Sequence, residues 1–591
     1  MRTVPLVAAL LAGCSLLSVP ATAQTIYPIN RAQILAGSRF DLKVEFPGLI
    51  EDVGALKLTI NGKDAAKVLG SSVELIARED GKPVSSLLLR DATIAKPGTY
   101  TVSASDGKNS QAVTWTVYGT SARAAARNVI LFIGDGFSIA HRTAARLLSK
   151  GVSDGKINGK LAMDEMPYMA LLTTQGTDSI ITDSANAAHA YTTGHKSCVN
   201  ALGVYCSRAA NSLDHPKVET IAEIAKRQGL AVGAVTNSEI EDATPAAMAA
   251  HTRRRSDFND IVKMFFDARI DVLMGGGSPN FLPQSTPGSK RKDDVDYIGQ
   301  FKGAGYAFAT TKSEMNEAAD QARTTKLLGL YNTSNIDGAL DLKFLKKGSV
   351  AKFPDQPDVV EEMRAAIKVL SRNKKGFVLM VESARIDKYS HSLDSERAIY
   401  DTIMLDNAVR EAQDWAKSQG NNTLILVTAD HTHGVSLVGT VDDDAPGSEM
   451  RNKVGVYEGA GFPNYPAPDA DGYPHKVDVS RRLRMVFGNT PDHYDTFRPF
   501  IDGEFVPALK NGDGVMVANE KYKDVPGAVL RVGNLPNSGP RAANQGVHTG
   551  DDVLLTAMGP GAQRVHGQLE NSDLFRVMAE ALALAPQGKS K

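Results

Sequence analysis

Residues 129–136, VILFIGDG, place five consecutive apolar side chains directly before a Gly-Asp-Gly turn. A continuous apolar run of this length is typical of a strand that is buried on both faces of a sheet. Runs of the same kind recur at Ala231–Thr236, Phe377–Val381 and Leu424–Thr428, and helical patterns lie at Val218–Gln228 and Ser395–Lys417. This alternation predicts an α/β fold with a mainly parallel central sheet flanked by helices.

Three acidic residues follow predicted buried strands almost immediately: Asp135, Glu382 and Asp430. In open α/β sheets, sites form at the carboxyl ends of the strands. We therefore expect these three carboxylates to converge at one edge of the sheet.

The composition is that of an ordinary soluble globular protein, with 42% apolar and 23% charged residues. A chain of 591 residues is expected to contain more than one domain. The net charge of −1 gives no overall field that would favour nucleic acid or an anionic membrane. Any affinity for phosphate must therefore come from a local site.

Residues 1–23 have the pattern of a signal peptide: Arg2, the apolar run Val4–Leu17, and the small-x-small cleavage site Ala21-Thr22-Ala23. The run is shorter than the roughly 20 apolar residues that a membrane-spanning helix needs. We therefore expect a periplasmic or secreted protein with no transmembrane segment. Leu11-Ala12-Gly13-Cys14 resembles a bacterial lipoprotein box, so a lipid anchor at Cys14, tethering the protein to the outer membrane, is the alternative.

The two cysteines outside this segment, Cys198 and Cys206, are close enough in sequence to close a small loop. In an oxidising compartment we expect them to form a disulfide. Two reduced thiols are the alternative.

Residues 24–120 read as a small β-sandwich. Phe40, Leu42, Val44 and Phe46 alternate with Arg39, Asp41, Lys43 and Glu45, which predicts a strand with one buried face and one exposed face. Asn61-Gly62 predicts a hairpin turn. Short strands without helical periods favour an immunoglobulin-like domain, and packing or spacing is favoured over partner binding as its role. Residues 121–591 are assigned to a catalytic domain with a loop-rich insertion at about 437–544.

Thr182-Asp183-Ser184-Ala185 is the candidate nucleophile segment. A lone serine at such a position is an ordinary helix N-cap in most proteins. Here, however, other segments supply the oxygen and imidazole ligands that zinc and magnesium need: Gly134-Asp135-Gly136, Asp242-Ala243-Thr244, Glu382–His391, Asp430–His433 and His548-Thr549-Gly550. One hydroxyl with so many metal ligands indicates metal-assisted attack on a charged ester.

The candidate ligands divide into three sets. Asp387 and His391 are four residues apart, on one side of a helical turn, and with His548 they offer the carboxylate and two imidazoles that a catalytic zinc takes. A second zinc set has an open position for the Ser184 oxygen, and a third set of hard oxygen donors suits magnesium. The second zinc set is Asp430, His431 and Asp135. The magnesium set is Asp135, Thr244 and Glu382.

The same segments, in the same order, resemble the bacterial members of the alkaline phosphatase superfamily. The resemblance covers most of residues 128–581 and leaves the N-terminal sandwich outside it. It implies a hydrolase of small phosphomonoesters that works through a phosphoserine at Ser184 with two zinc ions and one magnesium ion. Family members are often dimers, so the resemblance also leaves a homodimer open.

The resemblance further implies roles for residues around the ligands. Asp242 and Lys388 are expected beside the magnesium and the phosphate, where they act through water. His433 is expected to orient a ligand without touching metal, and Asp183 is grouped with these supporting residues. Arg255, thirteen residues after Asp242, is the expected phosphate clamp, with Arg253 and Arg254 as alternatives.

Two other functions stay open at this stage. A phosphodiesterase or sulfatase could share the fold. A third metal and a bidentate arginine, however, suit a dianionic terminal phosphate better than a diester, and no sulfatase motif is present. A cell-surface binding protein with a degenerate phosphatase domain is the other alternative, against which the intact ligand set argues.

Overall fold

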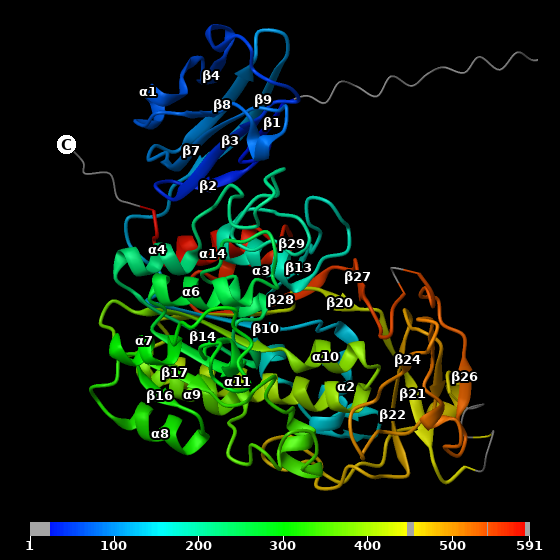
Figure 1. Ribbon diagram of the computed structural model, residues 1–591. Helices are drawn as coiled ribbons and strands as arrows, with labels where there is room; N and C mark the ends of the chain where they lie inside the picture. Colours follow the sequence, from blue (N-terminus) through cyan, green and yellow to red (C-terminus); the bar gives the residue numbers. More distant parts are fainter. Residues whose placement is uncertain (1–23, 446–448, 450–453, 540–541, 586–591) are drawn as a thin grey trace, which may run out of the picture. The chain divides into compact units, whose positions relative to one another are not determined.

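The computed structural model describes residues 24–445, 449, 454–539 and 542–585 and divides into two compact units (Figure 1). The smaller unit comprises residues 24–32, Asp41–Ala92 and Thr99–Trp115; the larger comprises Gln33–Phe40, Thr93–Gly98 and the described residues from Thr116 onward. The expected signal peptide and Cys14 lie outside the described residues. No described helix combines the length and apolarity needed to cross a bilayer.

A sheet of ten strands forms the centre of the larger unit, in the order β16-β17-β15-β14-β18-β10-β19-β28-β13-β29 (Figure 1). Within this sheet β28 is antiparallel to both of its neighbours, and the other neighbouring pairs are parallel. This confirms the predicted mainly parallel sheet. The strands are β10 (Asn128–Gly134), β13 (Tyr168–Leu172), β14 (Ala231–Glu239), β15 (Val272–Gly276), β16 (Ala307–Ala309), β17 (Leu327–Leu330), β18 (Phe377–Ser383), β19 (Thr423–Thr428), β28 (Val553–Met558) and β29 (His566–Leu569).

The four apolar runs of the sequence are the neighbouring strands β14, β18, β10 and β19. Every residue of β10, β18 and β19 is buried. They are buried because α9 and α11 cover one face of the sheet and α4 and α14 cover the other (Figure 1). The helices of this unit include α2 (Ile139–Lys150), α3 (Ser184–Thr193), α4 (Ile221–Gln228), α5 (Ala243–Ala246), α6 (Phe258–Ala268), α7 (Tyr297–Gly303), α8 (Lys312–Asp320), α9 (Val359–Leu370), α10 (Arg385–His391), α11 (Ser395–Ser418) and α14 (Asp573–Ala581).

The start of one helix differs from the prediction by three residues. The helix expected from Val218 begins at Ile221, because Thr220 caps it. The Thr220 hydroxyl accepts a hydrogen bond from the Glu223 backbone, and the Glu223 carboxylate accepts one from the Thr220 backbone. Such a reciprocal cap fixes the first turn.

The N-terminal region forms two small sheets, β1-β3-β7-β6 and β2-β9-β8-β4-β5, with one short helix, α1 (Ala65–Leu69). Asn61-Gly62 connects β4 to β5 with positive φ angles of 49° and 75°, the turn that the sequence predicts. The strand-rich region expected here is confirmed. Its strands are β1 (Thr25–Tyr27), β2 (Gln33–Leu35), β3 (Arg39–Glu45), β4 (Lys57–Ile60), β5 (Lys63–Asp64), β6 (Glu74–Ile76), β7 (Ser86–Thr93), β8 (Gly98–Ser105) and β9 (Ser110–Tyr118).

The predicted exposed face of β3 is wrong. Asp41, Lys43 and Glu45 are only 3%, 1% and 8% exposed. The Lys43 ammonium lies 2.5 Å from a carboxylate oxygen of Glu79 and 3.2 Å from one of Glu45, and Asp41 pairs with Arg90 at 2.6 Å. Because their charges are paired, these side chains are accommodated inside the domain.

The region expected as an insertion consists of short antiparallel pairs joined by long loops. β21 pairs with β22, β23 with β26, and β24 with β25. At its base, β20 (Thr432–His433) pairs with β27 (His548–Thr549). The bounds are β21 (Val435–Asp442), β22 (Arg481–Phe487), β23 (His493–Asp495), β24 (Ala508–Lys510), β25 (Met516–Ala518), β26 (Val529–Arg531) and the short helix α13 (Tyr457–Ala460).

The buried pair at Lys43 generates a stability prediction. Lys43→Ala leaves the Glu79 carboxylate without its buried cation, so the free energy of unfolding should fall by about 3 kcal/mol or more. Urea unfolding in a Trp415→Phe background, where Trp115 is the remaining tryptophan, measures this change. Lys57→Ala, at an exposed position of β4, is the matched control. Equal unfolding midpoints for the two variants would show that the pair contributes nothing.

Candidate metal centre and nucleophile

The three expected acids come together because their strands are neighbours. Parallel pairing sets Ile133 of β10 beside Glu382 of β18 and Thr428 of β19. Asp135 and Asp430 follow the ends of β10 and β19, and the Asp430 carboxylate accepts a hydrogen bond from the Gly136 backbone at 3.1 Å. Asp135, Glu382 and Asp430 are all at most 4% exposed.

The turn between β10 and α2 requires glycine at position 136. Gly136 has a φ of 65°, a conformation that side chains disfavour. A Cβ atom there would also lie 2.7 Å from the His433 ring and 3.1 Å from Asp387. Glycine therefore lets the chain carrying Asp135 pack directly against the segments that carry the other candidate ligands.

Asp387, His391 and His548 form the first group of ligand atoms. The Nε2 atoms of His391 and His548 each lie 3.3 Å from Asp387 Oδ1 and 3.1 Å from each other. Both imidazoles are oriented through their other nitrogen, His391 Nδ1 by the Gly546 carbonyl at 2.6 Å and His548 Nδ1 by the Thr182 carbonyl at 2.9 Å. One carboxylate and two oriented imidazoles are a donor set that suits zinc.

His433 lies against this first group. Its Nε2 atom is 2.6 Å from Asp387 Oδ1, the arrangement expected of a residue that orients a ligand. A combination of Asp387, His431, His433 and His548 also brings one donor atom of each within 4.8 Å of the others. The geometry alone thus leaves His433 close enough to be a ligand itself.

Asp135, Asp430 and His431 form the second group, and the candidate nucleophile joins it. His431 Nε2 lies 3.2 Å from an oxygen of Asp135 and 3.3 Å from one of Asp430. The Ser184 Oγ lies 3.3 Å from His431 Nε2 and 3.4 Å from both oxygens of Asp135. The hydroxyl therefore sits where it could complete the coordination of an ion held by this group.

Burial and the charges of neighbouring acids raise the pKa values of Asp135, Glu382 and Asp430, whereas the imidazoles around Asp387 outweigh its burial and lower its pKa. Burial, together with the charges of Asp387, Asp430 and Glu382, raises the pKa of Asp135 well above its usual range. Burial raises the pKa of Glu382 to about 7 and that of Asp430 to about 6. The carboxylates therefore lack enough neighbouring positive charge in the protein alone.

Two buried oxygens are suited to bind a cation. Asp430 Oδ2 and Thr244 Oγ1 have no hydrogen-bond partner among the described residues. Thr244 lies in α5, directly after Asp242, and the Thr236 hydroxyl donates to Glu382 at 2.5 Å. Buried polar atoms are normally satisfied, so these residues fit metal ions.

Ser184 is the first residue of α3 and is buried. Asp183 caps the helix, because its carboxylate accepts a hydrogen bond from the Asn186 backbone at 3.1 Å. The cap leaves Ser184 at the positive end of the helix dipole, where backbone N–H groups favour an anion.

Arg255, rather than its two neighbouring arginines, lines the cavity at Ser184. This cavity has a volume of about 290 Å³ and is lined by Ser184, Arg255, Asp387, Lys388, His391, Gln545 and His548. Arg253 instead donates to the Val199 carbonyl at 2.8 Å, and Arg254 is exposed. Gln545 is a lining residue that sequence reasoning missed, since a single glutamine in a loop carries no distinctive pattern.

Asp242 holds the two cations of this cavity in place. It accepts from Arg255 Nη2 at 2.8 Å and from Lys388 Nζ at 2.9 Å, and Asp183 lies 3.4 Å from Arg255 Nη1. Burial alone would raise the pKa of Asp242, but Lys388 and Arg255 outweigh it and hold the pKa below its usual value.

A disulfide between Cys198 and Cys206 closes a loop that contacts this cluster. The Asn200 backbone donates to the Asp183 carboxylate at 3.2 Å, and the Arg255 backbone donates to the Asn200 carbonyl at 3.0 Å. The expected cysteine pair is therefore bonded, and its loop links the helix cap to the arginine.

Comparisons with known proteins identify the family of the larger unit. A family model described as alkaline phosphatase matches residues 126–584. Alkaline phosphatase 4 of Bacillus subtilis is 30% identical over 470 residues, covering 78% of this chain and 89% of the relative. The alkaline phosphatase of Escherichia coli strain K12 is 34% identical over 363 residues, covering 54% of this chain and 73% of the relative.

Solved structures show the same fold. The alkaline phosphatase of Thermus thermophilus gives a TM-score of 0.56 at 24% identity, covering 79% of this chain and 93% of that one. The enzyme of the Antarctic bacterium TAB5 gives 0.51 at 20% identity, covering 78% and 99%. With the family model spanning most of the larger unit, the chain belongs to the alkaline phosphatase family.

Proposed function

We propose that this metal-dependent phosphomonoester hydrolase works through a covalent phosphoserine at Ser184, with two zinc ions and one magnesium ion. The observation that carries the proposal is the position of Ser184 Oγ, 3.3 Å from His431 Nε2 and 3.4 Å from Asp135. The hydroxyl thus lies at the junction of the ligand groups and at the N-terminus of α3.

The residues present fit three ions. Asp387, His391 and His548 would hold one zinc, and Asp430 and His431 with Asp135 would hold the other. Asp135, Thr244 and Glu382 would hold magnesium. When bound, these ions supply Lewis acidity and positive charge that lower the pKa of a nearby hydroxyl and neutralise phosphate oxygens.

The protein's own groups account for the two displacements. Ser184 loses its hydroxyl proton to solvent and Oγ attacks phosphorus in line. The Oγ–P bond forms, the bond from phosphorus to the leaving oxygen breaks, and that oxygen takes a proton from solvent. Water then attacks the phosphoserine from the vacated side and releases inorganic phosphate and Ser184. Arg255 binds two phosphoryl oxygens in a bidentate manner during both steps, with Lys388 beside it.

The paired cations at the cavity support the choice of substrate. Arg255 and Lys388 both line the cavity next to Ser184. Two cations and a third metal site suit the dianionic terminal phosphate of a monoester better than the single charge of a diester. This favours a phosphomonoesterase over a phosphodiesterase or sulfatase on the same fold.

Export to the periplasm or the cell exterior is part of this proposal. It is supported by the signal-like segment at residues 1–23 and by the Cys198–Cys206 disulfide, which is typical of oxidising compartments. A lipid anchor at Cys14 and a homodimer stay predictions.

Replacing the nucleophile tests the mechanism. Ser184→Ala should lower kcat for 4-nitrophenyl phosphate by about 10³-fold or more, because Ser184 carries the only hydroxyl among the described residues that line this cavity. Metal content, measured by mass spectrometry, should stay unchanged. Ser371→Ala, at the end of α9, is the control.

A comparison of substrates tests the substrate class. In the wild type, kcat/KM should be highest for the monoester; faster turnover of a phosphodiester or a sulfate ester would refute the proposed substrate class.

Metal removal should be visible in stability as well as activity. In the metal-free protein, the raised pKa values of Glu382, about 7, and Asp430, about 6, mean that the folded state holds protons that the unfolded state has lost. Their contribution to stability therefore falls as pH rises from about 4 to 7. The difference in Tm between metal-replete and chelated protein should widen over that interval.

Zinc plus magnesium should restore activity to the chelated protein. Restoration by calcium alone would show that the ligands were assigned to the wrong ions.

The disulfide loop should affect phosphate binding. Opening it in Cys198→Ser/Cys206→Ser frees Asn200 and lets Arg255 move, so the inhibition constant of inorganic phosphate should rise roughly fivefold. Arg255→Ala should raise it further, and Arg254→Ala, at the exposed neighbouring arginine, should leave it unchanged. An unaltered inhibition constant in a folded double-serine variant would show that the loop does not position the arginine.

A further inference from the structure

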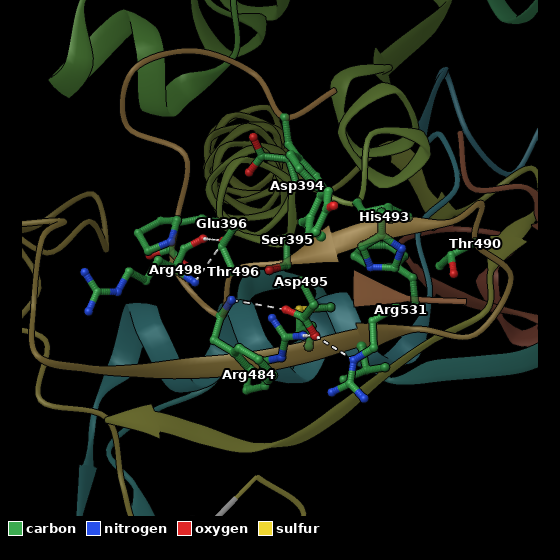
Figure 2. A pocket seen from close by; sticks show the side chains of 18 of the residues that line it. Asp394, Ser395, Glu396, Arg484, Thr490, His493, Asp495, Thr496, Arg498 and Arg531 are labelled. Atoms are coloured by element: carbon green, nitrogen blue, oxygen red, sulfur yellow. Dashed lines mark hydrogen bonds and ion pairs between the residues drawn. The ribbon is translucent and has the colours of Figure 1, made fainter. Parts of the chain in front are cut away.

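A second cavity, of about 410 Å³, lies within the insertion region (Figure 2). It is lined by the start of α11 and by segments around β22, β23 and β26, and it shares no lining residue with the cavity at Ser184. Its volume is within the range of small-molecule sites, roughly 300–1,000 Å³. Nothing in the proposed hydrolysis uses it.

The cavity wall carries more guanidinium groups than carboxylates to pair them. Arg484 and Arg531 share one carboxylate, Asp495, at 2.5 and 3.6 Å, and Figure 2 shows Asp495 between them. Arg482 and Arg498 likewise share Asp443, at 2.6 and 3.7 Å. A doubly shared carboxylate leaves each pair with a net positive charge.

The other nearby acids do not cancel this charge. Asp394 and Asp341 both pair with Arg397 at 2.8 Å, so this group keeps one negative charge against the two net positive charges of the arginine pairs. Glu396 accepts a hydrogen bond from the Tyr465 hydroxyl at 2.7 Å, and burial raises its pKa to about 7. Asp478 lies 3.9 Å from Arg482, but its side chain is 71% exposed and is therefore screened by water. The positive charge at Arg484 and Arg531 thus has no second anion among the described residues.

Buried donors in the same wall lack acceptors. Arg482 is 3% exposed, yet its Nε atom has no hydrogen-bond partner among the described residues. The same is true of Arg484 Nε. Burial also lowers the pKa of the Arg484 guanidinium. Because buried donors are normally paired, this wall is suited to an acceptor that the described residues do not supply.

Aromatic rings supply the rest of the recognition surface. Phe500 and Phe505 stack with centroids 4.0 Å apart, and both line the cavity. The Phe497 ring contacts both Arg484 and Arg531, whose guanidinium carbons lie 4.8 and 5.7 Å from its centroid. Guanidinium groups held against rings match planar oxyanions, and the other rings suit an apolar planar body.

We propose that this cavity is an accessory binding site for a small aromatic anion. Its carboxylate or phosphate group pairs with Arg484 and Arg531, and its ring packs against Phe500 and Phe505. This proposal stands apart from the hydrolytic one, since binding here needs neither Ser184 nor metal ions.

Isothermal titration of the full, metal-replete protein tests the site with three probes: benzoate, phenylphosphonate and the uncharged isostere benzamide. At least one of the two anions should bind, and benzamide should bind about tenfold more weakly or not at all. The stronger of the two anions identifies the head group. Arg531→Met should weaken that binding by about tenfold or more.

Matched variants make the result decisive. Arg531 has a 51% exposed side chain, so its replacement should leave the fold and the hydrolysis of 4-nitrophenyl phosphate unchanged. Arg484→Met repeats the test at the buried position, and Arg410→Met, at an ion pair with Glu165 outside the cavity, is the control. Any phenylphosphonate bound at Ser184 is unaffected by these changes. If neither cavity variant reduces the binding of either anion, if neither anion binds, or if benzamide binds equally well, the proposal is overturned.

Discussion

The mutual repulsion of buried carboxylates at one edge of the sheet is the constraint on which the site depends. Parallel pairing of β18, β10 and β19 delivers Glu382, Asp135 and Asp430 to the same place, where burial raises their pKa values. An edge of this kind is stable with ionised acids only if cations join it. Imidazoles from α10 and from residue 548 complete donor sets for those cations. The same cluster of buried acids therefore requires cations for its stability and would hold them for catalysis.

Asp183 connects Ser184, the proposed nucleophile, to Arg255, the proposed phosphate-binding cation. It caps α3, which places Ser184 at the helix N-terminus, and the same carboxylate contacts Arg255 and the backbone of Asn200. Asp242 then ties Arg255 to Lys388. Because one network sets these positions, the hydroxyl and the two cations are oriented before a substrate arrives, which lowers the entropic cost of reaching the transition state.

The sequence predicts those features that depend on local pattern. Apolar runs identify β10, β14, β18 and β19, and the acids after them identify the edge at which they meet. Features that depend on a distant partner cannot be predicted from local sequence. Lys43 is buried because Glu79 lies beside it, and Gln545 reaches the cavity because its loop returns to His391. The alternation in β3 is real, but the sequence pattern does not show that its polar face is covered as well.

The insertion is joined to the ligand-bearing segments through backbone contacts at its base. β20 pairs with β27 and aligns His433 with His548, the Gly488 backbone donates to Gly434 at 2.6 Å, and the Gly546 backbone donates to the His391 carbonyl at 2.7 Å. The accessory cavity begins at Leu393, two residues after His391. A ligand there would contact none of the residues that line the cavity at Ser184, so this shared backbone is the direct structural connection between the two sites. The same separation lets the insertion acquire its own specificity while the donor sets stay unchanged.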